Sequence, residues 1–188
     1  PATMPAKDVT VNSSFTVNKY LVTFKIGDVV VSSKSLEYGT AIVTPAAPEK
    51  EGYTFDGWGE VAETVPAHDV TYEGSYSVNS YKLTYMVDGE KYWEETVAYG
   101  TVLTAPNAPT KEGFTFSGWI GLPATMPAKD VTVIGSFVTN GYTLTYVVDG
   151  EGYKTLVYAY GSAVIAEPIP TKEGYTFSGW VGLPATMP

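Results

Sequence analysis

Few side chains in this sequence could carry out covalent chemistry. The 188 residues include no cysteine and one histidine, His68, so disulfides, thiolate metal sites and thiol catalysis are excluded. A catalytic triad would require His68 to lie within hydrogen-bond reach of a nucleophile. However, His68 lies in a Pro-Ala-x-Asp motif whose other copies carry Lys7 and Lys129 at the same place. A position shared by histidine and lysine indicates a solvated loop, and we expect no catalytic residue here.

Three carboxylates, Asp56, Glu60 and Glu63, are spaced closely enough to suggest a calcium site or a glycosidase pair. Their counterparts in the next copy of the same segment are not acidic, being Ser117, Gly121 and Ala124. No Asp-x-Asp-x-Asp-Gly loop is present either, and a calcium site needs several converging oxygen ligands. We therefore interpret the carboxylates as a solvated acidic patch and predict no metal site and no cofactor.

Two further patterns suggest covalent attachment. Lys111 and Asp130 could form an intramolecular isopeptide bond, which requires a buried lysine, but lysine is rarely buried and a solvated Lys111 is favoured. The sequence Leu-Pro-Ala-Thr-Met at 122–126 and 183–187 resembles the sorting signal Leu-Pro-x-Thr-Gly. Methionine replaces its final glycine, and the motif occurs in two repeats whereas an anchor is needed once per protein. We predict a loop.

These comparisons rest on a tandem repeat. A Gly-Trp step recurs every 61 residues, and another glycine lies six residues before each tryptophan. We expect these tryptophans and upstream glycines to be the structural anchors of the repeat: Trp58, Trp119, Trp180, Gly52, Gly113 and Gly174. Such a fixed period defines the fold unit. It predicts a strand of a preceding repeat plus the start of a linker at 1–16, repeat 1 at 20–77, repeat 2 at 81–138, and repeat 3 at 142–188 without its last strand.

One repeat contains the signals of a small, mainly β fold. In repeat 2, apolar residues alternate over 81–87, as expected for a strand with one buried face, and Asp88-Gly89 favours a tight hairpin turn. The segment between Gly100 and Pro106 predicts a short helical turn, because the prolines that follow cannot continue a helix. Further strands are predicted at 92–99, 114–116 and 130–137. We therefore expect an α+β, predominantly β, module.

Charge and composition exclude several partners. Twenty acidic and eleven basic residues give a net charge of −9, so nucleic acid and anionic membrane surfaces are unfavourable partners. Apolar runs fall far short of a membrane span, and we expect no direct membrane insertion. Aromatic residues make up 14% of the chain, and their burial must stabilise each small repeat.

The motifs Tyr-x-Leu-Thr-Tyr, Lys-Glu-Gly-Tyr-Thr-Phe-x-Gly-Trp and Met-Pro-Ala-x-Asp-Val-Thr-Val resemble the Listeria–Bacteroides repeat, including the internalin B-repeat. The resemblance covers every repeat. It implies a β-grasp-like module with a short helix, arranged in series on secreted or wall-attached bacterial surface proteins. The loop after Trp119 is shorter here than in longer forms, so ligand contacts made by that loop are not carried over.

The expected function is that of a non-enzymatic, semi-rigid stalk or spacer with an adhesion or protein-interaction role, outside the cell on the bacterial surface. The three-residue linkers between repeats are too short to behave as flexible coils. The alternative is a module that binds a glycan or a host protein through exposed strand aromatics. Trp93 is the residue of choice for such a contact, because Ser32 and Lys154 replace it in the other repeats.

A last expectation concerns Asp8 to Phe15, which match the segment that repeat 3 lacks. Such a strand could insert into the same place in another copy of the chain. Strand addition of this kind is head-to-tail and propagates instead of closing.

Overall fold

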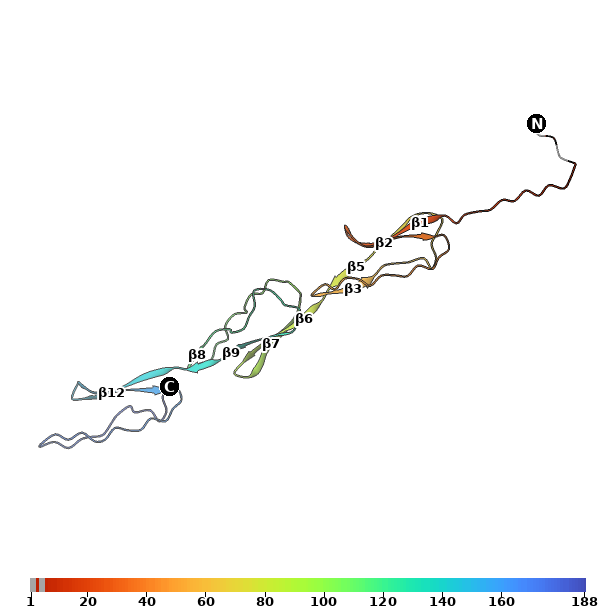
Figure 1. Ribbon diagram of the computed structural model, residues 1–188. Helices are drawn as coiled ribbons and strands as arrows, with labels where there is room; N and C mark the ends of the chain where they lie inside the picture. The colour runs from red at the N-terminus through yellow and green to blue at the C-terminus, as the bar shows by residue number, and fades with distance from the viewer. Residues whose placement is uncertain (1–2, 4–5) are drawn as a thin grey trace. The chain divides into compact units, whose positions relative to one another are not determined.

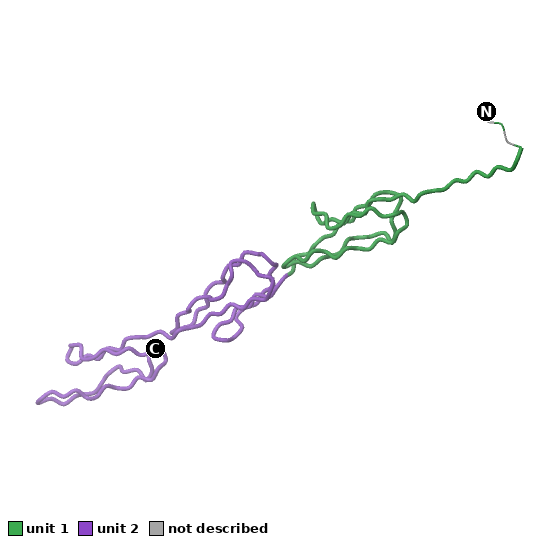
Figure 2. The backbone as a smooth tube through the Cα atoms, viewed as in Figure 1, with its two compact units in different colours: residues 1–79 green, residues 80–188 purple. Residues whose placement is uncertain are grey.

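The computed structural model describes residue 3 and residues 6–188 and forms two units, residues 1–79 and 80–188 (Figure 2). Unit 1 contains five strands: β1 (Lys19–Ile26), β2 (Val29–Glu37), β3 (Tyr53–Gly57), β4 (Val70–Glu73) and β5 (Ser75–Val78). Unit 2 contains β6 (Ser80–Val87), β7 (Glu90–Ala98), β8 (Phe114–Phe116), β9 (Val131–Gly135), β10 (Phe137–Thr139), β11 (Gly141–Val148) and β12 (Glu151–Ala159) (Figure 1).

Each repeat begins with an antiparallel hairpin: β1 with β2, β6 with β7, and β11 with β12. In repeat 2 the turn residues Asp88 and Gly89 have φ angles of 51° and 86°, which a type I′ turn requires. The predicted alternation is confirmed, because Leu83 and Tyr85 are buried while Lys82 is exposed. Complete burial of one such side chain contributes roughly 1.5–3 kcal/mol to stability.

The last segment of repeats 1 and 2 forms two strands instead of the single strand that the sequence predicts. β9 adds to the hairpin in parallel with β6, giving the order β7-β6-β9, and β10 pairs antiparallel with β8 in a second small sheet. Repeat 1 has the same arrangement, with β4 parallel to β1 and β5 antiparallel to β3. One continuous segment therefore joins the two sheets of a repeat.

The predicted short helix is wrong. The described residues contain no helix; the segment after Gly100 is extended, with Val102 bridged to Thr125 and the Leu103 amide 3.0 Å from the Ala124 carbonyl. Two β-branched residues, Thr101 and Val102, disfavour a helix, and the prolines nearby leave no room for one. The predominantly β expectation is confirmed, whereas the α+β class with a β-grasp helix is not.

In each repeat a tryptophan contacts both the sheet and the proline-rich segment that follows the hairpin, which is residues 101–110 in repeat 2. The Trp119 ring makes edge contacts with the rings of Tyr85 and Phe116, at centroid distances of 5.0 and 4.9 Å. Its indole N–H donates to the Pro106 carbonyl at 3.2 Å. The corresponding bonds run from Trp58 to Pro45 and from Trp180 to Glu167. The indole N–H thus gives a hydrogen bond to a backbone carbonyl that no neighbouring strand pairs with.

Two regions depart from this scheme. Residues 6–18 form no strand and are exposed, and Figure 1 draws them as an extended trace leading to β1. In repeat 3 the hairpin β11–β12 forms a two-stranded sheet alone, and residues 175–177, the counterparts of β8, are not in a strand.

Gly135 supplies a test of the packing between the two sheets. A Cβ atom at this residue would lie 2.3 Å from the Phe116 ring, whereas a Cβ at Gly152 would meet nothing within 4 Å. We expect Gly135→Ala to destabilise repeat 2 by roughly 1–3 kcal/mol through overpacking. Hydrogen exchange of β6 and β9 amides would measure the loss. Gly152→Ala is the matched control, and equal exchange in both variants would contradict the packing argument.

Candidate functional site

The residues proposed for catalysis or metal binding do not form a site. His68, Glu60 and Glu63 are exposed. Asp56 accepts hydrogen bonds from the hydroxyls of Ser75 and Ser77 at 3.1 and 2.7 Å, which ties β3 to β5. Across residues 3 and 6–188, no group of three or more His, Asp or Glu side chains is placed to hold a metal ion.

Lys111 and Asp130 are engaged with different partners. The Lys111 ammonium lies 4.0 Å from the Asp88 carboxylate and 4.2 Å above the Phe114 ring. The Asp130 carboxylate accepts the backbone N–H of Lys82 at 2.9 Å, and Asp69 does the same for Leu21 at 2.7 Å. Asp130 therefore fixes the start of the parallel strand pair, and the geometry does not support an isopeptide bond.

Tyr85 is a titratable residue whose side chain lies deep in a core. Its side chain is fully buried, and its hydroxyl has no hydrogen-bond partner among the described residues. Burial raises the pKa of this hydroxyl, and the nearby Glu95 carboxylate adds to the rise. Phe24 occupies the same position in repeat 1. The hydroxyl is thus dispensable for the fold and stays protonated at neutral pH.

An exposed aromatic pair lies on β7 of repeat 2. Trp93 is 43% exposed, and its ring stacks on that of Tyr85 with centroids 5.6 Å apart. Its neighbour Tyr92 is 49% exposed and lies against Trp119 at 5.7 Å. Both rings therefore cover the core with one face and present the other to solvent.

The most specific polar arrangement is the joint between repeats 2 and 3, centred on Asn140, the only residue between β10 and β11. Its backbone N–H donates to the Gly113 carbonyl at 2.8 Å, and its carbonyl accepts the Tyr160 N–H at 2.9 Å. Its side-chain oxygen accepts the Thr115 hydroxyl at 2.6 Å. One asparagine thus bonds to both repeats.

An aromatic contact completes this joint. The Tyr160 ring lies over Gly113, where a Cβ atom would be 2.1 Å from the ring, and 5.9 Å from the Phe114 ring. Gly113 also has a φ of 76°, which side-chain-bearing residues rarely adopt. Sequence reasoning placed Gly113 in the repeat register but missed Asn140, although Asn18 and Asn79 share its register.

Asn79 and Asn18, the counterparts of Asn140, form some of the same hydrogen bonds. Within unit 1, the Asn79 N–H donates to the Gly52 carbonyl at 2.8 Å, and the Thr54 hydroxyl donates to the Asn79 side chain at 2.6 Å. At the start of repeat 1, the Asn18 carbonyl accepts the Tyr38 N–H at 2.9 Å. Asn79 thus bonds to a glycine, Asn18 bonds to a tyrosine, and Asn140 bonds to both a glycine and a tyrosine.

Repeat 3 contains an open groove of about 750 Å³, lined by Leu144 to Val148 of β11 and by a facing segment that includes Tyr175 to Leu183. Two of the facing side chains are largely solvated, Tyr175 at 72% and Val181 at 97% exposure, whereas Phe177 and Trp180 are half-buried. In repeat 2 the corresponding edge of β6 is covered by β9. No described segment pairs with this edge of β11.

Paired substitutions at Tyr85 and Tyr146 test the role of the buried hydroxyl. We expect Tyr85→Phe to leave stability unchanged or raise it by about 1 kcal/mol, because an unsatisfied polar group is removed. Tyr146→Phe is the control, since the Tyr146 hydroxyl donates to the Ile165 carbonyl at 3.3 Å. This substitution should lower the free energy of unfolding by roughly 0.5–1.5 kcal/mol. Denaturant unfolding monitors both. If Tyr85→Phe lowered the free energy of unfolding more than Tyr146→Phe does, the Tyr85 hydroxyl would have a hydrogen-bond partner and the argument would be wrong.

Among the described residues, no helix is long and apolar enough to cross a membrane. A protein of Evansella cellulosilytica, whose name describes a Gly-rich membrane protein, is 30% identical over 198 residues, covering 94% of this chain and 23% of that protein. Internalin H of Listeria monocytogenes is 39% identical over 112 residues, covering 54% of this chain and 20% of internalin H. The chain thus spans less than a quarter of these relatives.

Among solved structures, domains 3–4 of the Streptococcal High Identity Repeats in Tandem of a cell surface protein match 64% of this chain and 98% of theirs. The identity is 16% and the TM-score 0.31, too low to support an argument about the fold. The family model of the Listeria–Bacteroides repeat domain matches residues 20–79, 81–133 and 142–182. This chain belongs to the Listeria–Bacteroides repeat family.

Proposed function

We propose that the chain is a non-enzymatic spacer of a bacterial cell-surface protein, in which successive repeats are joined semi-rigidly. The observation that carries this proposal is the joint at Asn140. β10 ends at Thr139 and β11 begins at Gly141, so a single residue links the strands of two repeats. A flexible linker would need several unrestrained residues.

Bending at this joint would break several contacts together. The three hydrogen bonds of Asn140 span 2.6–2.9 Å, and rotation would also expose the Gly113 backbone beneath Tyr160. Each intramolecular hydrogen bond contributes about 1 kcal/mol net, and an aromatic pair adds about 0.5–1.5 kcal/mol. Because these contacts share one pivot, they favour one orientation of the two repeats.

We propose as well that the protein lies outside the cell and has no catalytic activity. Internalin H and the Evansella membrane protein share this repeat, which supports an extracellular position on a bacterial surface. The exposed His68 and the dispersed carboxylates give no support to an enzymatic role.

Distance measurements between repeats 2 and 3 test the spacer proposal. Because the chain has no cysteine, spin labels can be placed uniquely at exposed positions such as Thr96 and Thr171. Pulsed electron resonance should give one narrow distance distribution, and Tyr160→Ala should broaden it. Tyr153→Val is the control, since repeat 1 carries Val31 there. A broad distribution in the unmodified chain would contradict a semi-rigid joint.

A second candidate function, binding of a glycan or host protein, is favoured by the exposed rings of Tyr92 and Trp93. Aromatic faces that are rigidly held and half-solvated suit stacking against sugars or anchoring in protein pockets. We expect Trp93→Ser, which installs the residue of repeat 1, to abolish any signal on a glycan or surface-protein array. Lys91→Ser on the same strand is the control. Binding that survives Trp93→Ser would remove this tryptophan as the contact.

A further inference from the structure

Repeat 2 begins and ends on two strands that lie side by side. The chain runs into the repeat through β6 and leaves it through β9 and β10. β6 pairs in parallel with β9, with Leu83 opposite Val131 and Val87 opposite Gly135. Because the two strands are parallel, the chain arrives at the Leu83 end of the pair and departs from the Val87 end. Repeat 1 has the same arrangement, with β4 parallel to β1.

Tension along the chain would therefore act on this pair in shear. A pull on the residues before β6 draws β6 in one direction, and a pull on the residues after β10 draws β9 in the other. The hydrogen bonds of a sheet cross from strand to strand, so this pull acts across them and they must break together. A pull on the same end of both strands would instead break them one after another. The first arrangement resists force better, since no single bond can fail alone.

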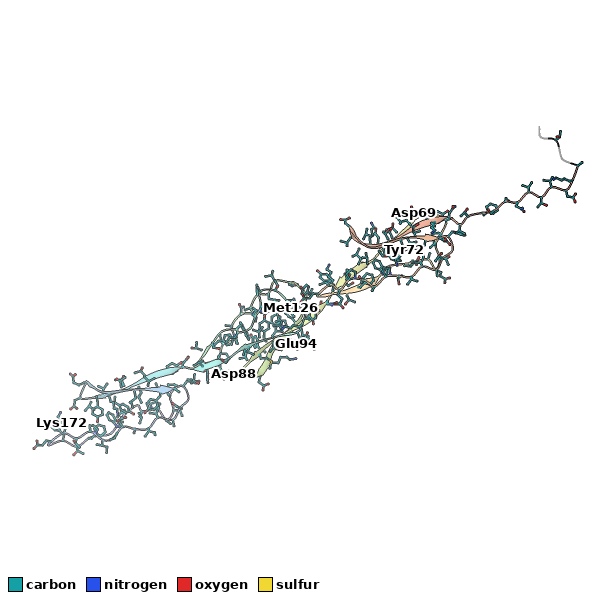
Figure 3. All side chains as sticks on the ribbon, in the orientation of Figure 1. Asp69, Tyr72, Asp88, Glu94, Met126 and Lys172 are labelled. Atoms are coloured by element: carbon teal, nitrogen blue, oxygen red, sulfur yellow. The ribbon has the colours of Figure 1, made fainter. Side chains whose placement is uncertain are left out.

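A carboxylate fastens each end of the parallel pair. At the first end, the Asp130 carboxylate, just before β9, accepts the Lys82 N–H of β6 at 2.9 Å. At the other end, the carboxylate of Asp88, labelled in Figure 3, accepts the Phe137 N–H of β10 at 3.0 Å. The Asp88 N–H also donates to the Gly135 carbonyl at 3.1 Å. Hydrogen bonds to a carboxylate are stronger than those between neutral groups, and both carboxylates join the two strands that tension would pull apart.

The side chains between these two ends oppose sliding of the strands. Tyr85 and Val133 lie opposite each other in the pair, and both are completely buried. A slip of one residue would turn every side chain of the moving strand to the other face of the sheet, so it would carry Val133 out of the core. The two strands therefore cannot slide gradually, because the first step already breaks the core contacts of repeat 2.

Repeat 1 fastens the same two ends of its parallel pair, partly with different side chains. At the first end, the carboxylate of Asp69, also labelled in Figure 3, accepts the Leu21 N–H at 2.7 Å. At the other end, the counterpart of Asp88 is a glycine, and the Lys25 ammonium of β1 instead lies 2.8 Å from the Glu73 carboxylate of β4. Both repeats thus keep a polar contact at each end of the pair, although the residues at the second end differ.

From this arrangement we infer that repeats 1 and 2 bear tension along the chain, and that the parallel strand pair of each repeat is the element that resists it. The inference deepens the spacer function proposed above and rests on it, because a spacer on a cell surface is pulled whenever its two ends are held apart. In repeat 2 the force passes from β6 directly to β9 and then into β10. The hairpin strand β7 and the proline-rich segment lie outside this path until the pair separates.

Single-molecule force measurements on the full chain test the inference through the direction of the pull. The chain has no cysteine, so handles can be attached at two introduced cysteines. Ser80→Cys with Thr139→Cys pulls repeat 2 along the path of the chain, whereas Ser80→Cys with Lys129→Cys pulls on the same end of β6 and β9. All three positions are exposed. We expect the first pair of handles to require a rupture force roughly twofold higher or more, because forced unfolding follows the unfolding barrier along the pulled direction.

Two substitutions separate resistance to force from ordinary structural stability. Asp130→Ala removes the carboxylate at the first end of the pair, and we expect it to shorten the lifetime of repeat 2 under constant force along the chain by roughly tenfold. Thr84→Val is the matched control, because it removes a side-chain hydrogen bond from the same strand, the one to Glu94 at 3.2 Å. That bond crosses from β6 to β7, outside the path of the force, so the lifetime should stay unchanged.

Equal rupture forces in the two directions of pull would overturn the inference, and so would equal lifetimes of the Asp130→Ala and Thr84→Val chains. These results are independent of the spin-label distances that test the spacer function. Equal rupture forces together with one narrow distance distribution would remove the resistance to tension and leave the semi-rigid spacer. A rupture force that depends on direction, together with a broad distance distribution, would support the resistance of the strand pair and remove the semi-rigid joint.

Discussion

The parallel pairing between the first strand of a repeat and the strand that begins its last segment, β4 or β9, is the constraint on which the other features depend. In repeats 1 and 2, β4 and β9 cover the open edge of the hairpin and bury Val22 and Val133 in the cores. The same segment then turns at a glycine and forms the second sheet as β5 or β10. Hairpin, proline-rich segment and tryptophan all pack against it.

Repeat 3 shows the effect of leaving that edge unpaired. Its hairpin keeps the same register and the same bulge as the other two, so the hairpin depends mainly on local sequence. By contrast, residues 175–177 form no strand, and Leu144 is only half-buried where Leu83 is fully buried. The Trp180 indole bond remains at 3.0 Å. The second sheet therefore requires its partner strand, whereas the tryptophan contact does not.

The joint follows from the same strand. β10 leads directly into β11 through Asn140, so a strand that completes one repeat also positions the next. Asparagine suits this position because one residue provides a backbone donor, a backbone acceptor and a side-chain acceptor. Repeats 2 and 3 are in this way connected by the backbone and side-chain hydrogen bonds of Asn140 and by the Tyr160 ring over Gly113.

The sequence by itself determined the repeat, the alternation of the first strand and the hairpin turn, because these depend on local periodicity and on residues such as Asp88 and Gly89. It also identified His68 and the three carboxylates as positions that vary between repeats, although it did not show that Asp56 lies in β3. Only the tertiary structure decided that the segment after Gly100 is extended, that the last strand divides near Gly135, and that Asn140 joins two repeats. These features depend on partners far away in the chain, such as Phe116 beneath Gly135 and Gly113 beside Asn140, and local sequence patterns do not specify which distant groups will satisfy them.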